Sequence, residues 1–392
     1  MPLIVELLPC YRRLETDHDF GTDAWHGDAG PLPIFRMPRE RWGAVDRAYA
    51  AALAGLGYPW HPDHNAPDAT GVSPYAINGD PLAQERVTTN DAYLEPARDR
   101  PNLVIRGDAL VDRVVVVDRV ARAVRVRLDG EWCEVRAREV VLAAGAVHSP
   151  AILLRSGIGP GLDVADLPVG RHLQDHPLCM VAFPLVPEAL PSSPLDRHTN
   201  VCMRYSSGLA GAGRNDMMMV ALNSMASAPV GMIGVWVNEC WSEGVLELAS
   251  DDPSVDPIIE ERMLDDSRDL ERMRDGIRRV LAVAASDPIQ AISSGPLLAS
   301  IPPPAIDAPD AEVDEWALRT AADAQHITST ARMGVSSTDS VVDLACRVHG
   351  IAGLRVVDAS VLPRVPRANT HLAVLAVAER AADVLQPIDG GR

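Results

Sequence analysis

The sequence predicts a mixed α/β fold in which a parallel sheet is joined to a second, antiparallel sheet. Residues 138–160, "REVVLAAGAVHSPAILLRSGIGP", begin with an apolar run, continue through Gly, Ser and Pro, and end in a helical pattern. Residues 172–250 alternate apolar and polar residues and contain the candidate strands "MMMVAL" and "MIGVWV". A strand–turn–helix unit beside a run of strands without helices predicts two different kinds of sheet in one chain.

Residues 102–145 contain three or four short, Val-rich runs separated by turn signals such as Asp129 followed by Gly130. These runs predict β-strands. The last of them, residues 140–143, is uniformly apolar, so we expect a central, parallel strand covered on both faces. Residues 20–100 are instead rich in Gly, Pro, Asp and Asn and predict long ordered loops over a surface.

Two helices are predicted in the second half of the chain. Residues 266–286 carry a helical pattern that Asp266 or Ser267 can cap. Its apolar face consists of Leu270, Met273, Ile277, Leu281 and Ala284. Residues 354–357 predict a short strand ending at Asp358, and residues 371–385 predict a helix that is apolar nearly all round and therefore buried.

Composition restricts the possible partners. The chain has 392 residues, 47 % hydrophobic residues and a net charge of −18, which predicts a globular protein and excludes a nucleic-acid partner. No apolar run approaches the roughly 18 residues of a transmembrane helix, so no membrane span is expected. The first residues lack the basic leader and cleavage site of a signal peptide, and we expect a cytoplasmic protein.

The cysteines and basic residues add two further expectations. The six cysteines are scattered without a CxxC pair, which favours free thiols in a reducing compartment. All 36 basic residues are arginine. A catalytic lysine or a Schiff base is therefore excluded.

Three groups of histidines are candidates for chemistry. His61 and His64 in "HPDH", and His172 and His176 in "RHLQDH", have spacings that a metal accepts. No Cys or carboxylate set accompanies them, so we interpret both pairs as structural or solvated loop residues and predict no metal site. His326 lies in "QHITSTARMGVSS", among small polar residues. No GxSxG motif is present to anchor a serine-hydrolase triad.

Several motifs, in this order along the chain, resemble the glucose–methanol–choline (GMC) oxidoreductase family. They are "AWHGDAGPLPI", "TTNDAYLEPARDRPNLVI", "GAVHSPAILLRSGIG", "VGRHLQDHP", "VLELASDDPSVDPIIEERML", "HITSTARMG", the "VVD" strand and "PRANTHLAV". The acidic stretches "LETDHDFG" and "HGDAGPLP" are also similar to the subgroup associated with mycofactocin. The resemblance covers nearly the whole chain.

This resemblance implies an FAD-binding domain of the two-dinucleotide type and an antiparallel substrate domain. The expected ranges are 1–170 for a partial FAD-binding domain with covering loops, 171–315 for the substrate domain, and 316–392 for the return to the FAD-binding domain. Family members begin with a strand, a GxGxxG turn and a helix that bind the FAD pyrophosphate. No such unit is found in this sequence, so we expect an N-terminally truncated chain lacking its first βαβ unit.

The resemblance also implies roles for individual residues. His326 matches the active-site histidine that takes the proton of an alcohol while hydride passes to flavin N5. Its partner is Asn369 or His371. The cofactor contacts are expected at Ala144, Gly145, Asp358 and Ala359 after two strands, at Asn369 and Thr370 where the last helix begins, and at Val111 near the adenine. For Val111, a plain strand residue remains an alternative.

Two other interpretations compete with an FAD-dependent alcohol oxidoreductase. One is a catalytically inactive remnant or interaction module of the same family, which keeps the substrate domain. The other is a metal-dependent hydrolase that uses the remaining histidines, which lacks a carboxylate set. The expected partners are a small alcohol and an electron acceptor that the sequence does not identify.

Overall fold

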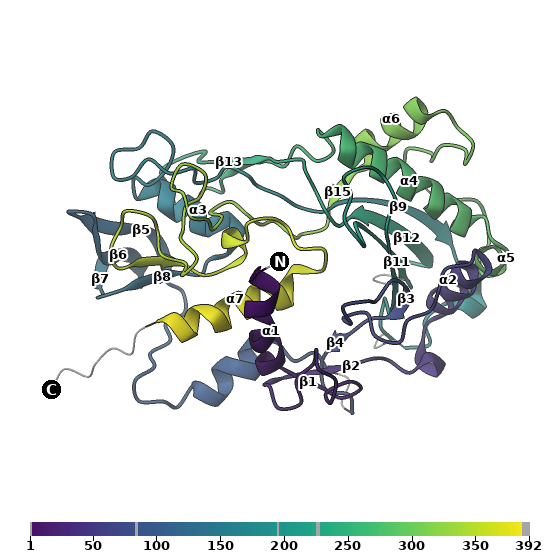
Figure 1. The fold of residues 1–392 in the computed structure, drawn as a ribbon, viewed down its shortest axis with the longest axis horizontal. Coiled ribbons are helices and arrows are strands. Elements are labelled where there is room, and N and C mark those ends of the chain that lie inside the picture. The colour runs from purple at the N-terminus through teal and green to yellow at the C-terminus, as the bar shows by residue number, and fades with distance from the viewer. Residues whose placement is uncertain (1, 83–84, 194–195, 225–227, 299, 386–392) are drawn as a thin grey trace.

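A computed structural model describes residues 2–82, 85–193, 196–224, 228–298 and 300–385 (Figure 1). Its largest sheet has six strands in the order β15-β9-β12-β11-β10-β3, and neighbouring strands pair antiparallel. The strands are β3 (Gly71–Pro74), β9 (Pro177–Pro184), β10 (Val201–Tyr205), β11 (Met217–Leu222), β12 (Val230–Val237) and β15 (Ala322–Asp323). The second, antiparallel sheet and both candidate strands in it are thus confirmed.

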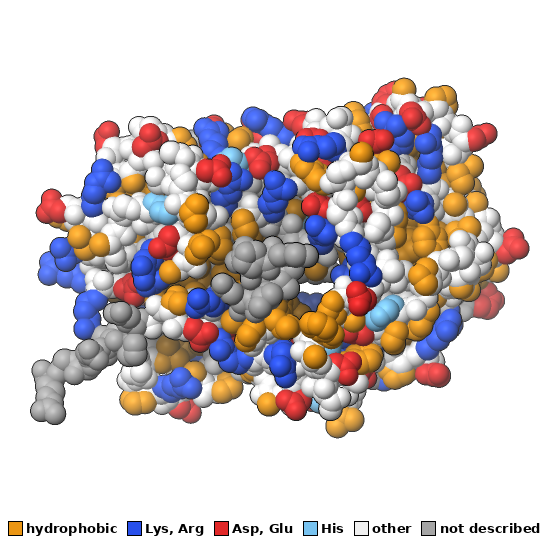
Figure 2. All heavy atoms as spheres, in the orientation of Figure 1, with side chains coloured by type: hydrophobic (Ala, Val, Ile, Leu, Met, Phe, Trp, Pro, Cys, Tyr) orange, Lys and Arg blue, Asp and Glu red, His pale blue; other side chains and the backbone are white. Residues whose placement is uncertain are grey.

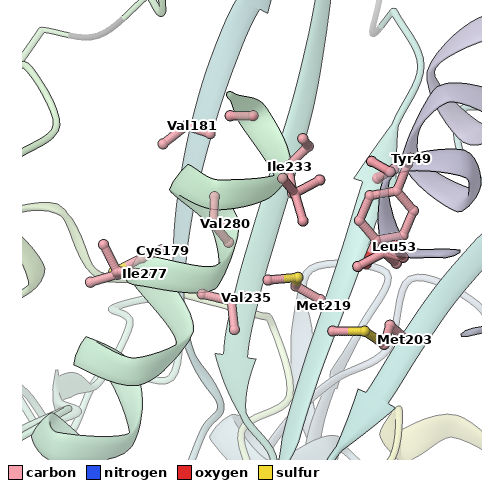
Figure 3. Close-up of a cluster of buried hydrophobic side chains, with 14 of the residues drawn as sticks. Tyr49, Leu53, Cys179, Val181, Met203, Met219, Ile233, Val235, Ile277 and Val280 are labelled. Atoms are coloured by element: carbon pink, nitrogen blue, oxygen red, sulfur yellow. The ribbon is translucent and has the colours of Figure 1, made fainter. Parts of the chain in front are cut away.

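One face of this sheet is covered by helices. They are α2 (Ala44–Gly55), α4 (Ser267–Ala284), α5 (Asp287–Gln290) and α6 (Asp310–Thr320). Figure 3 shows side chains of α2 and α4 packed with alternate residues of the strands: Tyr49, Leu53, Val181, Met203, Met219, Ile233, Val235, Ile277 and Val280. Alternation follows from the two-residue period of a strand. The predicted helix over 266–286 is confirmed, with Asp266 as its cap.

The second body holds the parallel pair β8 (Val140–Leu142) and β16 (Leu354–Val356), with α3 (Gly145–Arg155) following β8. A three-stranded antiparallel sheet lies beside it, formed by β5 (Leu110–Val117), β6 (Val120–Leu128) and β7 (Glu131–Arg136). The strands predicted over 102–145 are confirmed. The parallel direction of β8 is also confirmed, but its central position is not, because among the described residues it pairs only with β16.

The last helix, α7 (Thr370–Val384), was expected to be buried, and that expectation is wrong. Only Ala376, Val377 and Ala381 are buried. Helix α1 (Pro2–Leu14) crosses α7 and packs against it, as Figure 1 shows. The remaining sides of α7 are partly open, although their composition is apolar. This apolar composition indicates a helix suited to more cover than the described residues give it.

The remaining elements are short. A small sheet joins β1 (Glu15–Asp17), β2 (Leu32–Phe35) and β4 (Ile77–Asn78), and a two-stranded ribbon joins β13 (Val245–Glu247) and β14 (Ile258–Glu260). Short helical turns are η1 (Arg39–Arg41), η2 (Asn90–Leu94), η3 (Glu95–Ala97), η4 (Pro187–Ala189) and η5 (Ala359–Val361). Residues 20–100 therefore hold more regular structure than the predicted loops, notably α2.

The six-stranded sheet crosses the predicted domain boundaries. It takes β3, and its cover α2, from the range 1–170, and it takes β15 from the range 316–392. No described helix is long and apolar enough to cross a membrane. On the face drawn in Figure 2, acidic and basic side chains are interspersed, and no basic patch of the kind that binds nucleic acid is visible there.

Candidate active site

Three segments far apart in sequence are joined by backbone hydrogen bonds to form the site. Residues 170–175 pair with residues 328–330, where Gly170 N donates to Thr330 O at 2.7 Å and Thr328 N donates to Gln174 O at 2.9 Å. Residues 329–333 then pair with residues 359–361 beside β16. "VGRHLQDHP", "HITSTARMG" and the end of the "VVD" strand thus lie side by side.

His326 and Asn369 face each other in this site. Asn369 Nδ2 lies 3.3 Å from His326 Nε2. His326 is partly buried, whereas Asn369 is exposed at the start of α7. Burial lowers the pKa of His326 below its ordinary value, although the negative charge of Asp323 acts to raise it. The imidazole is therefore neutral at physiological pH and able to accept a proton.

His176 is a further member of the site. Its Nδ1 lies 2.9 Å from His326 Nδ1, and its Nε2 lies 3.0 Å from the carbonyl oxygen of Pro366. The ring is fully buried, and burial lowers the pKa of His176 to about 3. Of the two interpretations of His176, a solvated loop residue is wrong, and the buried ring is a structural neighbour of His326. Its place in "VGRHLQDHP", beside the site by resemblance, was the available signal.

Asp175 ties the two histidines to one another through the backbone. Its carboxylate accepts the N–H of His176 at 2.6 Å and the N–H of His326 at 2.9 Å. Burial raises the pKa of Asp175 to about 6, although these backbone hydrogen bonds work in the opposite direction. Gln325, immediately before His326, has a φ of +60°, a conformation that costs energy for a side chain with a Cβ. Such residues are frequent at functional sites.

The predicted cofactor residues cluster at the carboxyl ends of β8 and β16. Gly145 N donates to Asp358 Oδ2 at 3.0 Å, and Ser149 Oγ donates to the same oxygen at 2.5 Å. The other carboxylate oxygen accepts from the backbone and hydroxyl of Ser360. Protein donors thus occupy the Asp358 side chain. The N–H groups of Ala144 and Gly145 and the carbonyl of Ala359 are also hydrogen-bonded within the protein, so what this strand end offers a ligand is the exposed surface of Ala144 beside Gly145.

A hydrogen bond from Thr330 completes the packing of α3. Pro150 has no N–H to bond the carbonyl of Ala146 one turn earlier. Thr330 Oγ donates to that carbonyl at 2.7 Å instead. The "HITSTARMG" segment is thereby fixed to the helix that follows β8, within reach of both strand ends.

The residues present fit the flavin end of FAD. Gly145 has a φ of +84°, and a Cβ added to it would meet no atom within 4 Å, so the backbone faces open space. Ala143 and Ala144 are exposed at the same strand end. Ligands of open α/β sheets bind in this position. Asn369 caps α7 without a side-chain hydrogen bond to its first turn, so the first N–H groups of α7 are available to an anion.

The described residues contain no glycine-rich turn between a strand and a helix for the pyrophosphate. In its place, β8 presents a free edge. Val140 N and Leu142 O bond toward the β16 side, so the N–H and C=O of Val141 point away from β16. The Val141 side chain is 42 % exposed. Among the described residues, the edge of β8 opposite β16 is therefore unpaired.

For three of the predicted site residues, the structure shows no hydrogen bond to His326. His371 is exposed in the first turn of α7, and no described hydrogen bond joins it to His326. Val111 lies in β5, opposite Val126 of β6, and packs against the core beside β8. Thr370 begins α7 next to Asn369. Of the two candidate partners of His326, the structure brings Asn369 to it.

The other histidines and acidic residues have partners elsewhere. His64 is buried, with its Nδ1 3.3 Å from the Cys202 sulfur, and His172 pairs with Glu243. Glu15, Asp17 and His26 lie close enough together to hold a metal, but buried Arg36 and Asp63 pair with members of this group. All six cysteines are free, as predicted.

An apolar wall borders the reactive pair. The Trp236 ring lies 6.4 Å from the His326 ring in an edge orientation. Trp236 belongs to a cluster with Cys202, Met218 and Val220 on the face of the large sheet opposite the helices, and Leu178 packs against it. The face of the six-stranded sheet that α2 and α4 do not cover therefore borders the site.

Comparison with known proteins gives consistent matches. Family models described as GMC oxidoreductase match residues 5–178 and 241–378. A 5-(hydroxymethyl)furfural oxidase of Methylovorus sp. is 34 % identical over 97 % of this chain and 75 % of its own length. An oxygen-dependent choline dehydrogenase 1 of Chromohalobacter salexigens is 30 % identical over 98 % of this chain and 74 % of its own. The crystal structure of pyridoxine 4-oxidase from Mesorbium loti superposes with a TM-score of 0.86 at 30 % identity, covering 97 % of this chain and 77 % of that one.

Proposed function

This chain belongs to the GMC oxidoreductase family, and we propose that it is an FAD-dependent enzyme that oxidises the CH–OH group of a primary alcohol. The observation that carries the proposal is the pair formed by His326 Nε2 and Asn369 Nδ2, which lie 3.3 Å apart. A neutral imidazole can accept the proton of an alcohol hydroxyl, and the neighbouring amide can donate a hydrogen bond to the same oxygen.

Each residue has a defined role in this proposal. His326 Nε2 takes the hydroxyl proton, and Asn369 Nδ2 donates a hydrogen bond to the oxygen as negative charge develops on it. FAD held at the strand ends would supply the acceptor for the hydride that leaves the carbinol carbon, while the residues of this chain hold the alcohol and take its proton. The free N–H groups in the first turn of α7 would stabilise negative charge on the reduced cofactor. The product is an aldehyde.

The substrate class that we propose is a hydroxymethyl group on an aromatic ring. The partly buried Leu178, packed against the Trp236 cluster beside His326, supports an apolar substrate ring, because flat rings pack well against apolar side chains. Two of the similar proteins are named for a hydroxymethylated furan and for pyridoxine. The choline dehydrogenases supply the alternative substrate, a small cationic alcohol.

We also propose that a strand–GxGxxG–helix unit adds to the free edge of β8 and supplies the pyrophosphate site. The open edge at Val141 and the incompletely covered α7 support this. We propose that oxygen re-oxidises the reduced flavin, because two of the similar proteins are named oxidases. A mycofactocin-type carrier is the alternative, for which the sequence similarity noted above is the support.

The test is oxidation of 5-(hydroxymethyl)furfural, pyridoxine and choline by protein supplied with FAD. Aldehyde formation is measured directly, and peroxide formation separates oxygen from a dye as the acceptor. With FAD in excess, we expect turnover of the aromatic alcohols and its loss in His326→Ala, with the affinity for added FAD unchanged. Absence of turnover with FAD demonstrably bound would favour the inactive remnant or interaction module instead.

A further inference from the structure

The hydrogen-bond pattern around His326 carries an inference that rests on the proposed function and deepens it. We propose that His176 is a positioning residue that fixes the ring tautomer of His326 and leaves Nε2 of His326 as its proton-accepting atom. His176 itself does not touch the alcohol. It acts through the contact between the Nδ1 atoms of the two rings.

The first step concerns the proton on His176. The carbonyl oxygen of Pro366 lies 3.0 Å from His176 Nε2 and can only accept, so Nε2 carries the hydrogen. The ring is completely buried, and burial lowers the pKa of His176 to about 3. His176 is therefore neutral at pH 7, and its Nδ1 is left with a lone pair.

The second step transfers this constraint to His326. The two Nδ1 atoms are 2.9 Å apart, a hydrogen-bond distance that requires one of them to donate. Since His176 Nδ1 has no hydrogen, His326 Nδ1 must carry one. Burial lowers the pKa of His326, so this ring is also neutral. Its remaining nitrogen, Nε2, then presents a lone pair toward Asn369 Nδ2.

The surroundings hold His176 in the orientation that this argument needs. The Trp236 ring stacks on it at 6.4 Å with an interplanar angle of 21°. The Asp175 carboxylate accepts the backbone N–H of both histidines, which fixes their spacing. Without an acceptor at Nδ1, the tautomer of His326 would be free to change. Its Nε2 would then carry a hydrogen for part of the time and could not accept the alcohol proton.

Two substitutions at one position separate this role from a structural one. In His176→Asn, the side-chain oxygen occupies the place of Nδ1 and can still accept from His326. In His176→Gln, the amide reaches the place of Nε2 and can still donate to Pro366 O, but no acceptor faces His326. His64→Gln removes another buried histidine ring and serves as the control. Thermal unfolding of each variant measures the purely structural cost.

The decisive measurement is nitrogen NMR on histidine-labelled, flavin-free protein at pH 7.5. Correlations across two bonds show which ring nitrogen carries the hydrogen, and comparison with His326→Asn assigns the signal among the 11 histidines. We expect the Nδ1–H tautomer for His326 in the unmodified chain, in His176→Asn and in His64→Gln, and a mixture in His176→Gln. An Nε2–H tautomer in the unmodified chain, or an unchanged tautomer in His176→Gln, would overturn the proposal.

Kinetics in protein supplied with FAD give the second readout. We expect kcat to fall about a hundredfold in His176→Gln, with KM little changed and with partial recovery in His176→Asn. The failures of the two proposals differ. An inactive protein with the expected tautomers would refute the proposed oxidation alone, whereas an active His176→Gln with an unshifted kcat would refute the role of His176 alone.

Discussion

Asn369 and His371 lie two residues apart at the start of α7, and both carry groups that can donate a hydrogen bond to an alcohol oxygen. Asn369 is the residue that precedes the first helical turn, and its amide approaches His326 Nε2. His371 lies within the first turn and is exposed. The residue at which α7 begins therefore decides which side chain lies beside His326. Because α7 begins at Thr370, that side chain is Asn369.

Asn369→Leu should lower kcat by about a hundredfold, because it removes the donor that stabilises the developing negative charge on oxygen. KM should change little, since the lost interaction is strongest in the transition state. His371→Gln is the matched control two residues away and should leave kcat near its original value. Steady-state rates of alcohol oxidation in FAD-supplied protein measure both. A larger loss in His371→Gln would make His371 the partner.

The sequence could predict His326 and Asn369 only by resemblance, because either residue alone also suits a structural role. His176 shows the limit of such reasoning. Its motif "VGRHLQDHP" indicates a place near the site, but not its contacts with a ring 150 residues away and with the carbonyl of Pro366. Spacing along the chain carries no information on a contact of that kind. Tertiary structure is needed to identify it.

At the scale of elements, the turn from β8 into α3 depends on Gly145. Its φ of +84° suits glycine, and the space in front of it is open. The apolar pattern predicted β8, α3 and the parallel direction correctly. It could not predict which strand edges remain unpaired or how far α7 is covered, because an apolar side chain does not specify what buries it.

Gly145→Ala should destabilise the fold by about 1 kcal/mol through backbone strain alone, since its Cβ meets no atom. Gly130→Ala is a matched control in the turn between β6 and β7, because its φ is +86° and its surroundings are equally open. Both variants should show similar unfolding free energies. Only Gly145→Ala should weaken FAD binding, measured by fluorescence titration. Equal FAD affinity in the two variants would exclude close passage of the cofactor at Gly145.

The small sheet near α1 is held by a buried ionic network with its own pH dependence. His26 bonds Glu15 through Nδ1 and Asp63 through Nε2, and Arg36 bonds Asp17 and Asp63. Burial alone would lower the pKa of His26, but the hydrogen bonds to Asp63 and Glu15 outweigh it and raise the pKa to about 10. The proton on His26 is therefore bound more tightly in the folded chain than in the unfolded one.

This network should make the protein less stable as pH rises from about 6.5 to about 10. The stabilisation from His26 is complete below its unfolded pKa and is lost as pH passes the folded pKa. The slope should approach about 1.4 kcal/mol per pH unit in that interval. Urea unfolding of the unmodified chain and of His26→Gln at several pH values measures it. The exposed His18→Gln should keep the slope, and an unchanged slope in His26→Gln would contradict the assignment.

At the scale of the whole molecule, the two bodies divide the work. The six-stranded sheet presents Trp236 and the covered base His326, while β8, β16 and α7 present open backbone. The unpaired edge of β8 and the partly exposed sides of α7 both belong to the body that holds the β8–β16 pair. The molecule should therefore keep its fold without FAD and bind FAD weakly.

The chain purified by itself should lose flavin on gel filtration and elute without absorbance near 450 nm. Addition of a separate strand–GxGxxG–helix fragment of the kind that binds the FAD pyrophosphate should restore flavin binding by pairing with β8. Val141→Pro provides the control, because it removes an N–H that bonds nothing in β16 and proline is tolerated on a strand edge. That variant should fold normally and fail to respond to the fragment. Tight flavin binding without the fragment, or an equal response in Val141→Pro, would show that the free edge of β8 is not where the site is completed.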